Sequence, residues 1–295
     1  MTEEAVFEQR AGEPLFRIID GEVCVPVFTP EDYRSAKALE PRDDDVFIVT
    51  YPKSGTTWTQ HIVCQLMIED YATQKELFSC SPAIERVGAA VVNQYQSPRI
   101  LKSHWKYGNI PKSSKAKYII LCRNPKDIIV SLFHMAKNYE SVKWEDGKLE
   151  VLFEMFCEGR LPWGGYFDWH QGWFEHLNDP NVLFVKYEDR VRDLKGQITK
   201  IGEFLGGRAA EVVKDSQKLD AIVEASKFET MKKGAKTWFP NLLINPEKFI
   251  RKGTTGDWKN YLTKEQSDRI DEMFEKNMKG TVAEKWWTEE MKWEE

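Results

Sequence analysis

The sequence has little cysteine, no long apolar run and no excess of positive charge. Its five cysteines among 295 residues are odd in number, show no Cys-x-x-Cys spacing and mostly lie in apolar segments. Such cysteines are typical of reduced core residues in a cytoplasmic protein and argue against a metal site. No segment approaches the roughly 20 apolar residues that span a bilayer. The acidic N-terminus also lacks the apolar run of a signal peptide.

The charge and composition indicate a globular chain. The formal net charge of −5 gives no indication of a nucleic-acid partner or a polybasic membrane anchor. A hydrophobic content of 41% is enough for a substantial core. We find no internal repeat, and the one abrupt change in composition is the Trp- and Glu-rich segment 286–295. We therefore expect one domain over residues 1–295, cytoplasmic, with no metal and no membrane or nucleic-acid partner.

Short apolar runs alternate with segments of helical periodicity along most of the chain. We expect strands at 46–50, 99–104, 117–123 and 181–187, a hairpin turn at 20–21, and helices at 30–39, 58–67, 127–139 and 189–205. Apolar strands separated by helices favour a parallel sheet. The predicted fold class is α/β, a single P-loop-like domain whose parallel β-sheet is flanked by helices on both faces.

The segment 46–58 is the most informative part of the sequence. A strand runs into the loop Lys53-Ser54-Gly55-Thr56-Thr57, and Trp58 begins the next helical pattern. Such a turn aims backbone amides and a helix N-terminus at one place, where a phosphate binds well. The loop differs from G-x-x-x-x-G-K-[ST] because its lysine precedes its glycine. An ordinary capped strand-to-helix turn is the alternative.

Two further segments could hold phosphate. Arg123 follows a strand at the place where a P-loop NTPase has a Mg²⁺-binding aspartate. An arginine there can instead clamp a phosphate, and Ser131 lies two helical turns further on. Arg251-Lys252-Gly253 supplies two cations beside an approachable backbone. The alternatives are an ion pair between Arg123 and Asp127, and a solvated basic turn.

The strand ends are expected to bring these segments together. Ligands of open α/β sheets bind at the carboxyl ends of the strands. Lys53, His104, Arg123 and Tyr187 each lie at or just after such an end. The sequence therefore predicts one shared site.

Three strings in the chain resemble motifs of the cytosolic sulfotransferases, which use 3′-phosphoadenosine-5′-phosphosulfate (PAPS). Tyr-Pro-Lys-Ser-Gly-Thr-Thr-Trp at 51–58 is similar to the family's 5′-phosphosulfate loop, and 123–131 is similar to its 3′-phosphate motif. Arg-Lys-Gly-x-x-Gly-Asp-Trp-Lys at 251–259 is the other hallmark. The three strings follow the family's order, so the resemblance covers nearly the whole chain. It implies PAPS as donor substrate, PAP as product, and no metal.

The resemblance also implies a nucleotide site. Residues 53–58 would hold the 5′-phosphosulfate, with Trp58 stacked on the adenine, and Tyr187 would also contact the adenine. Arg123, Ser131 and 251–253 would hold the 3′-phosphate. The segment 226–231 aligns with a further nucleotide segment, in which only its phenylalanine and methionine match cleanly. The implied nucleotide-binding residues are Lys53, Ser54, Gly55, Thr56, Thr57, Trp58, Arg123, Ser131, Tyr187, Ser226, Phe228, Met231, Phe249, Arg251, Lys252 and Gly253.

His104 is the candidate general base. It lies in Leu-Lys-Ser-His-Trp at 101–105, which is similar to the family's Lys-Thr-His segment. Imidazole is suited to removing a hydroxyl proton near neutral pH. Lys53 would stabilise charge on the departing oxygen, and Lys102 would neutralise the transferring sulfonate. The predicted reaction is in-line transfer from PAPS to the hydroxyl, or amine, of a small phenolic acceptor.

Aromatic residues could form an apolar wall for that acceptor. The candidates are Phe16, Trp105, Tyr139, Phe153, Phe156, Trp163, Tyr166, Phe167 and Trp169. Aromatic residues are more often part of the core, which is the alternative. His61, His134, His170 and His176 are interpreted as structural.

Two other functions and two assembly states stay open at this point. A P-loop small-molecule kinase would need a Mg²⁺-binding aspartate and a lysine after the glycine, and a non-catalytic phosphonucleotide-binding protein would not need Lys53 or His104. Many sulfotransferases dimerise through Lys-x-x-x-Thr-Val-x-x-x-Glu. Lys259 and Thr263 match that segment, but Lys264 replaces the valine. We therefore expect a monomer or a non-standard homodimer.

Overall fold

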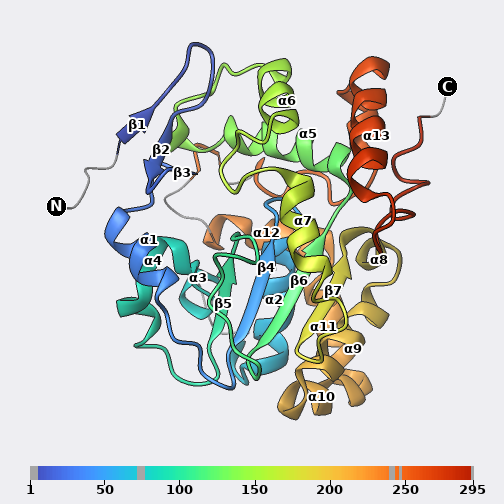
Figure 1. Ribbon diagram of the computed structural model, residues 1–295. Helices are drawn as coiled ribbons and strands as arrows, with labels where there is room; N and C mark the ends of the chain where they lie inside the picture. Colours follow the sequence, from blue (N-terminus) through green and yellow to red (C-terminus); the bar gives the residue numbers. More distant parts are fainter. Residues whose placement is uncertain (1–5, 72–76, 239–242, 246–247, 294–295) are drawn as a thin grey trace.

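The computed structural model describes residues 6–71, 77–238, 243–245 and 248–293. Its centre is a parallel sheet in the order β5-β4-β6-β7 (Figure 1). The strands are β4 (Val46–Thr50), β5 (Ile100–Ser103), β6 (Lys117–Cys122) and β7 (Val182–Lys186). The predicted parallel α/β sheet is confirmed, and the ends of β5, β6 and β7 leave His104, Arg123 and Tyr187 as the first residues beyond them.

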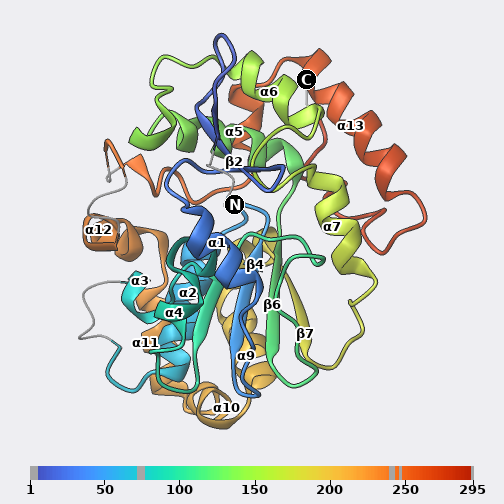
Figure 2. The same cartoon turned by 60° about the vertical axis from the view of Figure 1, so that its left-hand side comes forward.

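Both faces of the sheet are covered, because alternate residues of each strand point to opposite sides. Val46 and Ile48 of β4 pack into one apolar cluster, and Phe47 and Val49 pack into the other. The first cluster lies under α2 (Thr56–Met67), α9 (Leu194–Leu205), α10 (Gly207–Lys214) and α11 (Ser216–Ala225). The second lies under α1 (Pro30–Lys37), α4 (Ile84–Val92) and α7 (Tyr166–Phe174). The predicted helices on both faces are confirmed (Figures 1 and 2).

A second group of elements lies beyond the carboxyl ends of the strands. Figures 1 and 2 show α5 (Pro125–Ala136), α6 (Leu149–Cys157) and α13 (Lys264–Met278) gathered there, far from α10. The remaining elements are α12 (Phe228–Trp238) and four shorter ones: α3 (Leu77–Cys80), η2 (Glu140–Val142), α8 (Tyr187–Arg192) and η4 (Asp257–Asn260). This second group closes the end of the sheet at which a ligand is expected.

The N-terminal segment forms a small antiparallel sheet. Its strands are β1 (Val6–Glu8), β2 (Phe16–Ile19) and β3 (Glu22–Cys24). Asp20 and Gly21 join β2 to β3 with φ of 52° and 78°, as a two-residue hairpin turn requires. The predicted hairpin is confirmed.

All four predicted helices differ from expectation in their boundaries: α1 ends at Lys37 and not at 39, and α5 covers Pro125–Ala136 and not 127–139. Gly55 adopts φ 96° and α2 begins at Thr56, two residues before Trp58. Residues 187–205, predicted as one helix from 189, form α8 and α9 because Asp193 breaks the helical conformation. The Asp193 side chain accepts a hydrogen bond from the Gly196 amide, so it is the N-cap of α9.

The Trp-rich C-terminal segment packs against the domain. The Trp258 indole donates to the backbone oxygen of Glu290 at 2.9 Å, and the buried Lys126 ammonium donates to that of Met291 at 2.6 Å. The Trp287 indole donates to the Glu188 carboxylate at 2.7 Å. The change in composition near residue 286 therefore marks a segment that packs against η4, α5 and α8.

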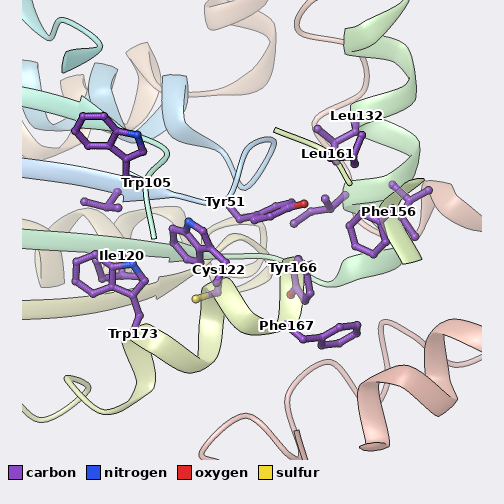
Figure 3. Packing of buried hydrophobic residues seen from close by; sticks show 14 of the residues in the cluster. Tyr51, Trp105, Ile120, Cys122, Leu132, Phe156, Leu161, Tyr166, Phe167 and Trp173 are labelled. Carbon is purple, nitrogen blue, oxygen red and sulfur yellow. The ribbon is translucent and has the colours of Figure 1, made fainter. Parts of the chain in front are cut away.

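The apolar core explains the cysteines and most of the aromatic residues. Figure 3 shows Tyr51, Trp105, Cys122, Tyr166 and Trp173 packed together beside the sheet. All five cysteines are free thiols and none is exposed, as predicted. Among the described residues, no helix is both long enough and apolar enough to cross a bilayer.

Candidate active site

A cavity of about 360 Å³ lies at the carboxyl ends of the strands. All the predicted nucleotide residues except Ser54 line it, together with both Lys102 and His104. Its cationic lining residues are Lys53, Lys102, Arg123, Arg190, Lys227, Arg251 and Lys252. No carboxylate of the described chain lines it. In a protein of net charge −5, such a lining is suited to an anionic ligand.

The loop after β4 is held from behind by Arg190, which sequence reasoning missed. The Arg190 guanidinium is fully buried and donates to the Ser54 carbonyl at 3.0 Å and to the Thr59 hydroxyl at 2.5 Å. Because the Ser54 carbonyl is turned towards Arg190, the loop can present its amides to the cavity. A Cβ on Gly55 would lie 2.4 Å from the guanidinium. Within Tyr-Glu-Asp-Arg, Arg190 looks like one surface charge among several, so no signal in the sequence pointed to this contact.

Ser54 is placed differently from its neighbours. Its side chain is fully buried and its hydroxyl has no hydrogen-bond partner among the described residues. Its amide donates to the Tyr51 carbonyl at 3.3 Å. Its hydroxyl does not line the cavity, and its part in ligand binding stays a prediction.

Arg123 joins three segments at the cavity wall. Its guanidinium donates to the carbonyls of Lys53 at 3.1 Å and Thr254 at 3.2 Å, and lies 4.1 Å from the centre of the Tyr187 ring. The Asp127 carboxylate lies 3.8 Å from the Arg123 guanidinium, so the ion pair that the sequence suggested is only a long contact. The Arg123 Nε is buried without a partner in the described chain. The guanidinium is thus fixed in place and still able to bind an anion.

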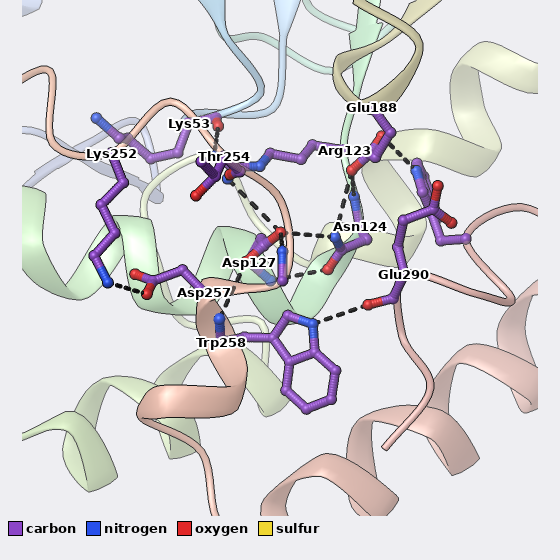
Figure 4. A network of polar contacts seen from close by, with 12 residues as sticks. Lys53, Arg123, Asn124, Asp127, Glu188, Lys252, Thr254, Asp257, Trp258 and Glu290 are labelled. Atoms are coloured by element: carbon purple, nitrogen blue, oxygen red, sulfur yellow. Dashed lines mark hydrogen bonds and ion pairs between the residues drawn. The ribbon is translucent and has the colours of Figure 1, made fainter. Parts of the chain in front are cut away.

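The 251–258 loop is fastened to the start of α5 by Asp127 (Figure 4). The Asp127 carboxylate accepts from the amides of Gly256 at 2.8 Å and Trp258 at 3.2 Å. Asp257 pairs with both Arg251 and Lys252. These carboxylates lie behind the cavity wall, so they position the loop and its cations.

Aromatic side chains form one side of the cavity. Trp58 and Tyr187 meet edge to face with ring centres 5.7 Å apart, and the Trp58 indole donates to the Ser226 carbonyl at 2.9 Å. Phe228 would be only 2.2 Å from a Cβ on Gly253, so the 226–231 segment packs directly against the basic loop. This arrangement suits a flat ring such as a nucleobase.

Lys53 is in an unfavourable place for a positive charge. Its φ is 70°, and its ammonium lies 4.4 Å from the centre of the Phe249 ring. Burial, followed by the charges of Arg123, Arg251 and Lys102, lowers the pKa of Lys53 to about 7. An anion in the cavity would reverse the effect of those charges.

His104 is held with one nitrogen free for chemistry. Its Nδ1 lies 2.9 Å from the Thr50 carbonyl oxygen and 2.9 Å from the Thr50 hydroxyl. Because a carbonyl only accepts, Nδ1 carries the proton and Nε2 is the unprotonated nitrogen. Burial, together with the charge of Lys102, holds the pKa of His104 well below its usual value. The neutral imidazole can therefore accept a proton at Nε2.

Glu85, also missed from the sequence, supports this histidine from outside the cavity. Its Oε1 accepts from the Ser103 hydroxyl at 2.7 Å and from the His104 amide at 2.5 Å. Burial lowers the pKa of Lys102 to about 8, and the nearby Glu85 carboxylate opposes that shift. Glu85 thus fixes the backbone at the end of β5 and keeps Lys102 partly charged.

A second, apolar cavity of about 110 Å³ adjoins the first. Lys102 and His104 line both cavities. Phe16, Tyr139 and Trp163 line the second, as predicted for the acceptor wall. The other six candidates do not line this cavity, so that part of the prediction is wrong. They are buried in the core: Trp105, Phe153, Phe156, Tyr166, Phe167 and Trp169. Sequence reasoning missed Val25, Phe28, Phe78, Arg86 and Leu161.

The remaining histidines line neither cavity. The ring nitrogens of His61 contact the Tyr71 hydroxyl and the Ala225 carbonyl, and His170 contacts the Tyr166 carbonyl. His176 contacts Asp179, and His134 packs against the Tyr261 ring. Within the described residues, no cluster of three or more potential metal ligands occurs.

The chain is similar to known proteins over almost its whole length. Residues 43–282 match the family model of the sulfotransferase domain. The chain is 40% identical to the amine sulfotransferase of Oryctolagus cuniculus over 256 residues, which cover 82% of this chain and 83% of the relative. It is 34% identical to Sulfotransferase 1C2 of Homo sapiens over 285 residues, which cover 89% and 92%.

A solved structure has the same fold. The crystal structure of mouse sulfotransferase SULT7A1 complexed with PAP matches with a TM-score of 0.78 and 28% identity. The match covers 93% of this chain and 99% of that one. The family-model match over residues 43–282 includes every segment that lines the cationic cavity, and every segment that lines the apolar cavity except residues 14–28.

Proposed function

The chain belongs to the sulfotransferase family, and we propose that it transfers a sulfonate group to the hydroxyl of a small phenolic molecule. It is a PAPS-dependent sulfotransferase, as the sequence predicts, and not a kinase or a non-catalytic binding protein. The acceptor class, the general base and the in-line course of the reaction are our proposals. The observation that carries them is that His104 lines both the cationic cavity and the apolar one.

The cationic cavity fits PAPS, which supplies a sulfonate bonded to a phosphate leaving group. Lys53 and the first-turn amides of α2 would hold the 5′-phosphosulfate at a helix N-terminus. Arg123, whose Nε has no partner in the described chain, would hold the 3′-phosphate with Ser131 and the 251–253 loop. Trp58 and Tyr187 form the aromatic wall for the adenine.

Three side chains of the protein would carry out the transfer. Nε2 of His104 accepts the acceptor's hydroxyl proton as the oxygen attacks sulfur, a contribution of about 10²–10⁴-fold. Lys53 supplies positive charge to the leaving phosphate. Lys102, at the junction of the two cavities, neutralises the sulfonate. Because fixed cations already line the donor cavity, we expect no metal requirement.

The apolar cavity would bind the acceptor. Phe16, Tyr139 and Trp163 line it, and the Trp163 ring lies edge to face on His104 with centres 5.6 Å apart. A flat phenol fits such walls, and its hydroxyl would face the imidazole. A small amine is the second candidate, favoured by the 40% identity to an amine sulfotransferase.

We further propose that residues 1–295 form one cytoplasmic domain. Both apolar clusters are built on the two faces of the same sheet, which supports a single domain. Thr263 caps α13 and Lys264 pairs with Asp268, so the degenerate dimer segment is used within the chain. We expect a monomer or a non-standard homodimer, which light scattering of the purified protein would distinguish.

The reaction is tested with PAPS and 2-naphthol in EDTA, by measuring sulfated product. We expect product without added metal, and an amine such as aniline tests the second candidate in parallel. His104→Ala should still show a raised melting temperature with PAP but should lose roughly 10²–10⁴-fold in turnover. Turnover like that of the wild type would refute the assignment of the base. Failure of PAP to raise the melting temperature of the wild type would refute the donor site.

A further inference from the structure

The apolar cavity contains one cation that the proposed reaction does not use. Arg86 of α4 lines this cavity and is half-buried. The other charged or titratable side chains in the lining are Lys102, His104 and Tyr139. No carboxylate of the described residues faces the cavity. Among the described lining residues, the charges are therefore all positive: that of Arg86 at all accessible pH values, and that of Lys102 in its protonated form.

Within the described part of the chain, no carboxylate pairs with Arg86. Its guanidinium makes no hydrogen bond or ion pair with any described residue, and its neighbour Glu85 is engaged elsewhere. Glu85 accepts from the Ser103 hydroxyl and the His104 amide and does not line the cavity. An unpaired guanidinium on an apolar wall is costly, and a ligand anion would remove that cost.

Tyr139 adds a second donor to the same cavity. It also lines the cationic cavity, and its hydroxyl makes no hydrogen bond within the described chain. Burial raises the pKa of Tyr139 to about 12, while the charge of Arg86 opposes that shift. Tyr139 is therefore a neutral hydroxyl within the electrostatic reach of Arg86, and it can donate to an anion.

We propose that the acceptor is an acidic phenol, in which a carboxylate at the far end from the reacting hydroxyl pairs with Arg86 and Tyr139. This inference rests on the proposed function, since it specifies the acceptor of the same site. His104 and Lys102 bind the hydroxyl end, and Arg86 binds the acid end. A cationic phenol is disfavoured by the two positive charges of the lining.

Binding is measured first, so that the test does not depend on turnover. Titration of PAP-saturated protein with 4-hydroxyphenylacetate, its methyl ester or tyramine is followed by calorimetry. We expect the carboxylate to bind more tightly than the ester, and tyramine to bind most weakly. Arg86→Gln should reduce the preference for carboxylate over ester roughly 10- to 100-fold, and Arg86→Lys should restore part of it. Arg208→Gln, which removes an exposed arginine on α10, is the charge-matched control.

Turnover of the same three phenols gives a second readout. The preference for the carboxylate over its methyl ester should appear mainly in KM, because the carboxylate lies away from the reacting atoms. Arg86→Glu should reverse the order and favour tyramine. The inference is overturned if the wild type binds carboxylate and ester equally, or if Arg86→Gln and Arg208→Gln change the preference to the same extent. Selective binding of the carboxylate without any sulfation would instead overturn the proposed function.

Discussion

Replacement of Lys53 by arginine should change how many protons the protein takes up when it binds PAP. Burial and three neighbouring cations lower the pKa of Lys53 to about 7, so only about a tenth of these side chains are charged at pH 8 without nucleotide. The phosphate held at this loop would restore the charged form. The wild type should therefore take up about 0.9 proton at Lys53 for each PAP bound at pH 8.

Calorimetry at pH 8 in Tris and in HEPES measures this uptake, because the two buffers differ in ionisation enthalpy. Arginine keeps its charge at all accessible pH values, so Lys53→Arg should lose about 0.9 proton of uptake. PAP affinity of the wild type should fall between pH 7 and 9, and that of Lys53→Arg should fall much less. Lys102→Arg is the matched control. Because the pKa of Lys102 is about 8, this variant should lose only about half a proton of uptake at pH 8. Equal uptake by the wild type and Lys53→Arg would refute the reasoning.

The same pKa predicts how the nucleotide-free protein depends on pH. The folded-state pKa of Lys53 lies below its unfolded value, so the unfolded chain binds more protons between about pH 7 and 10.5. The contribution of Lys53 to stability therefore rises with pH across this window and is most unfavourable at pH 7 and below. Discounted for partial exposure, Lys53→Met should raise the free energy of unfolding by about 1–3 kcal/mol at pH 7. Urea denaturation of both proteins without nucleotide measures this difference in the free energy of unfolding.

Two further substitutions test how the site is held together. Gly55→Ala should abolish PAP binding and lower the melting temperature, because its Cβ would meet a buried guanidinium at 2.4 Å. Gly12→Ala is the control, because Gly12 has a similar φ of 78° but lies in open space, and it should cost only about 1–2 kcal/mol of backbone strain. Equal losses of melting temperature in the two variants would contradict this account. Asp127→Ala should weaken PAP binding by roughly tenfold or more, because it frees the amides of Gly256 and Trp258. Asp127→Asn keeps one acceptor oxygen and should lose less affinity for PAP, as calorimetric titration would show.

The donor half of the site could be predicted from sequence for a simple geometric reason. Parallel strands bring their carboxyl ends to one edge of the sheet, so residues that follow β4, β5 and β6 must lie near each other. Lys53, His104 and Arg123 each follow one of those strands directly or within three residues. Their convergence needs no knowledge of how the helices pack.

The acceptor half could not be predicted in this way. Its walls come from loops and short elements at 14–28, 78–86 and 161–163 and from the region of α5 and α6 at 132–152. Tertiary contacts decide which side chain faces inward. Trp163 and Trp169 look alike in the sequence, yet Trp163 lines the cavity and Trp169 is 1% exposed in the core. Arg190 was missed for the same reason, because only the folded structure shows that a charge in a helix of mixed polarity points inward.

Three carboxylates behind the cavity walls accept hydrogen bonds from backbone amides, whereas Asp257 pairs with the lining cations Arg251 and Lys252. Glu85 accepts from the amide of His104, Asp127 from those of the 251–258 loop, and Glu188 from the amide of Asn124 at 3.0 Å. Each of these carboxylates positions a wall segment and none of them lines either cavity. None of these carboxylates pairs with Lys53, which is therefore repelled by Arg123, Arg251 and Lys102 until an anion enters. The binding energy of the donor therefore includes the relief of a repulsion that already exists in the folded, nucleotide-free protein. Removal of a lining cation such as Lys53 should consequently raise the stability of the protein and lower its affinity for the donor.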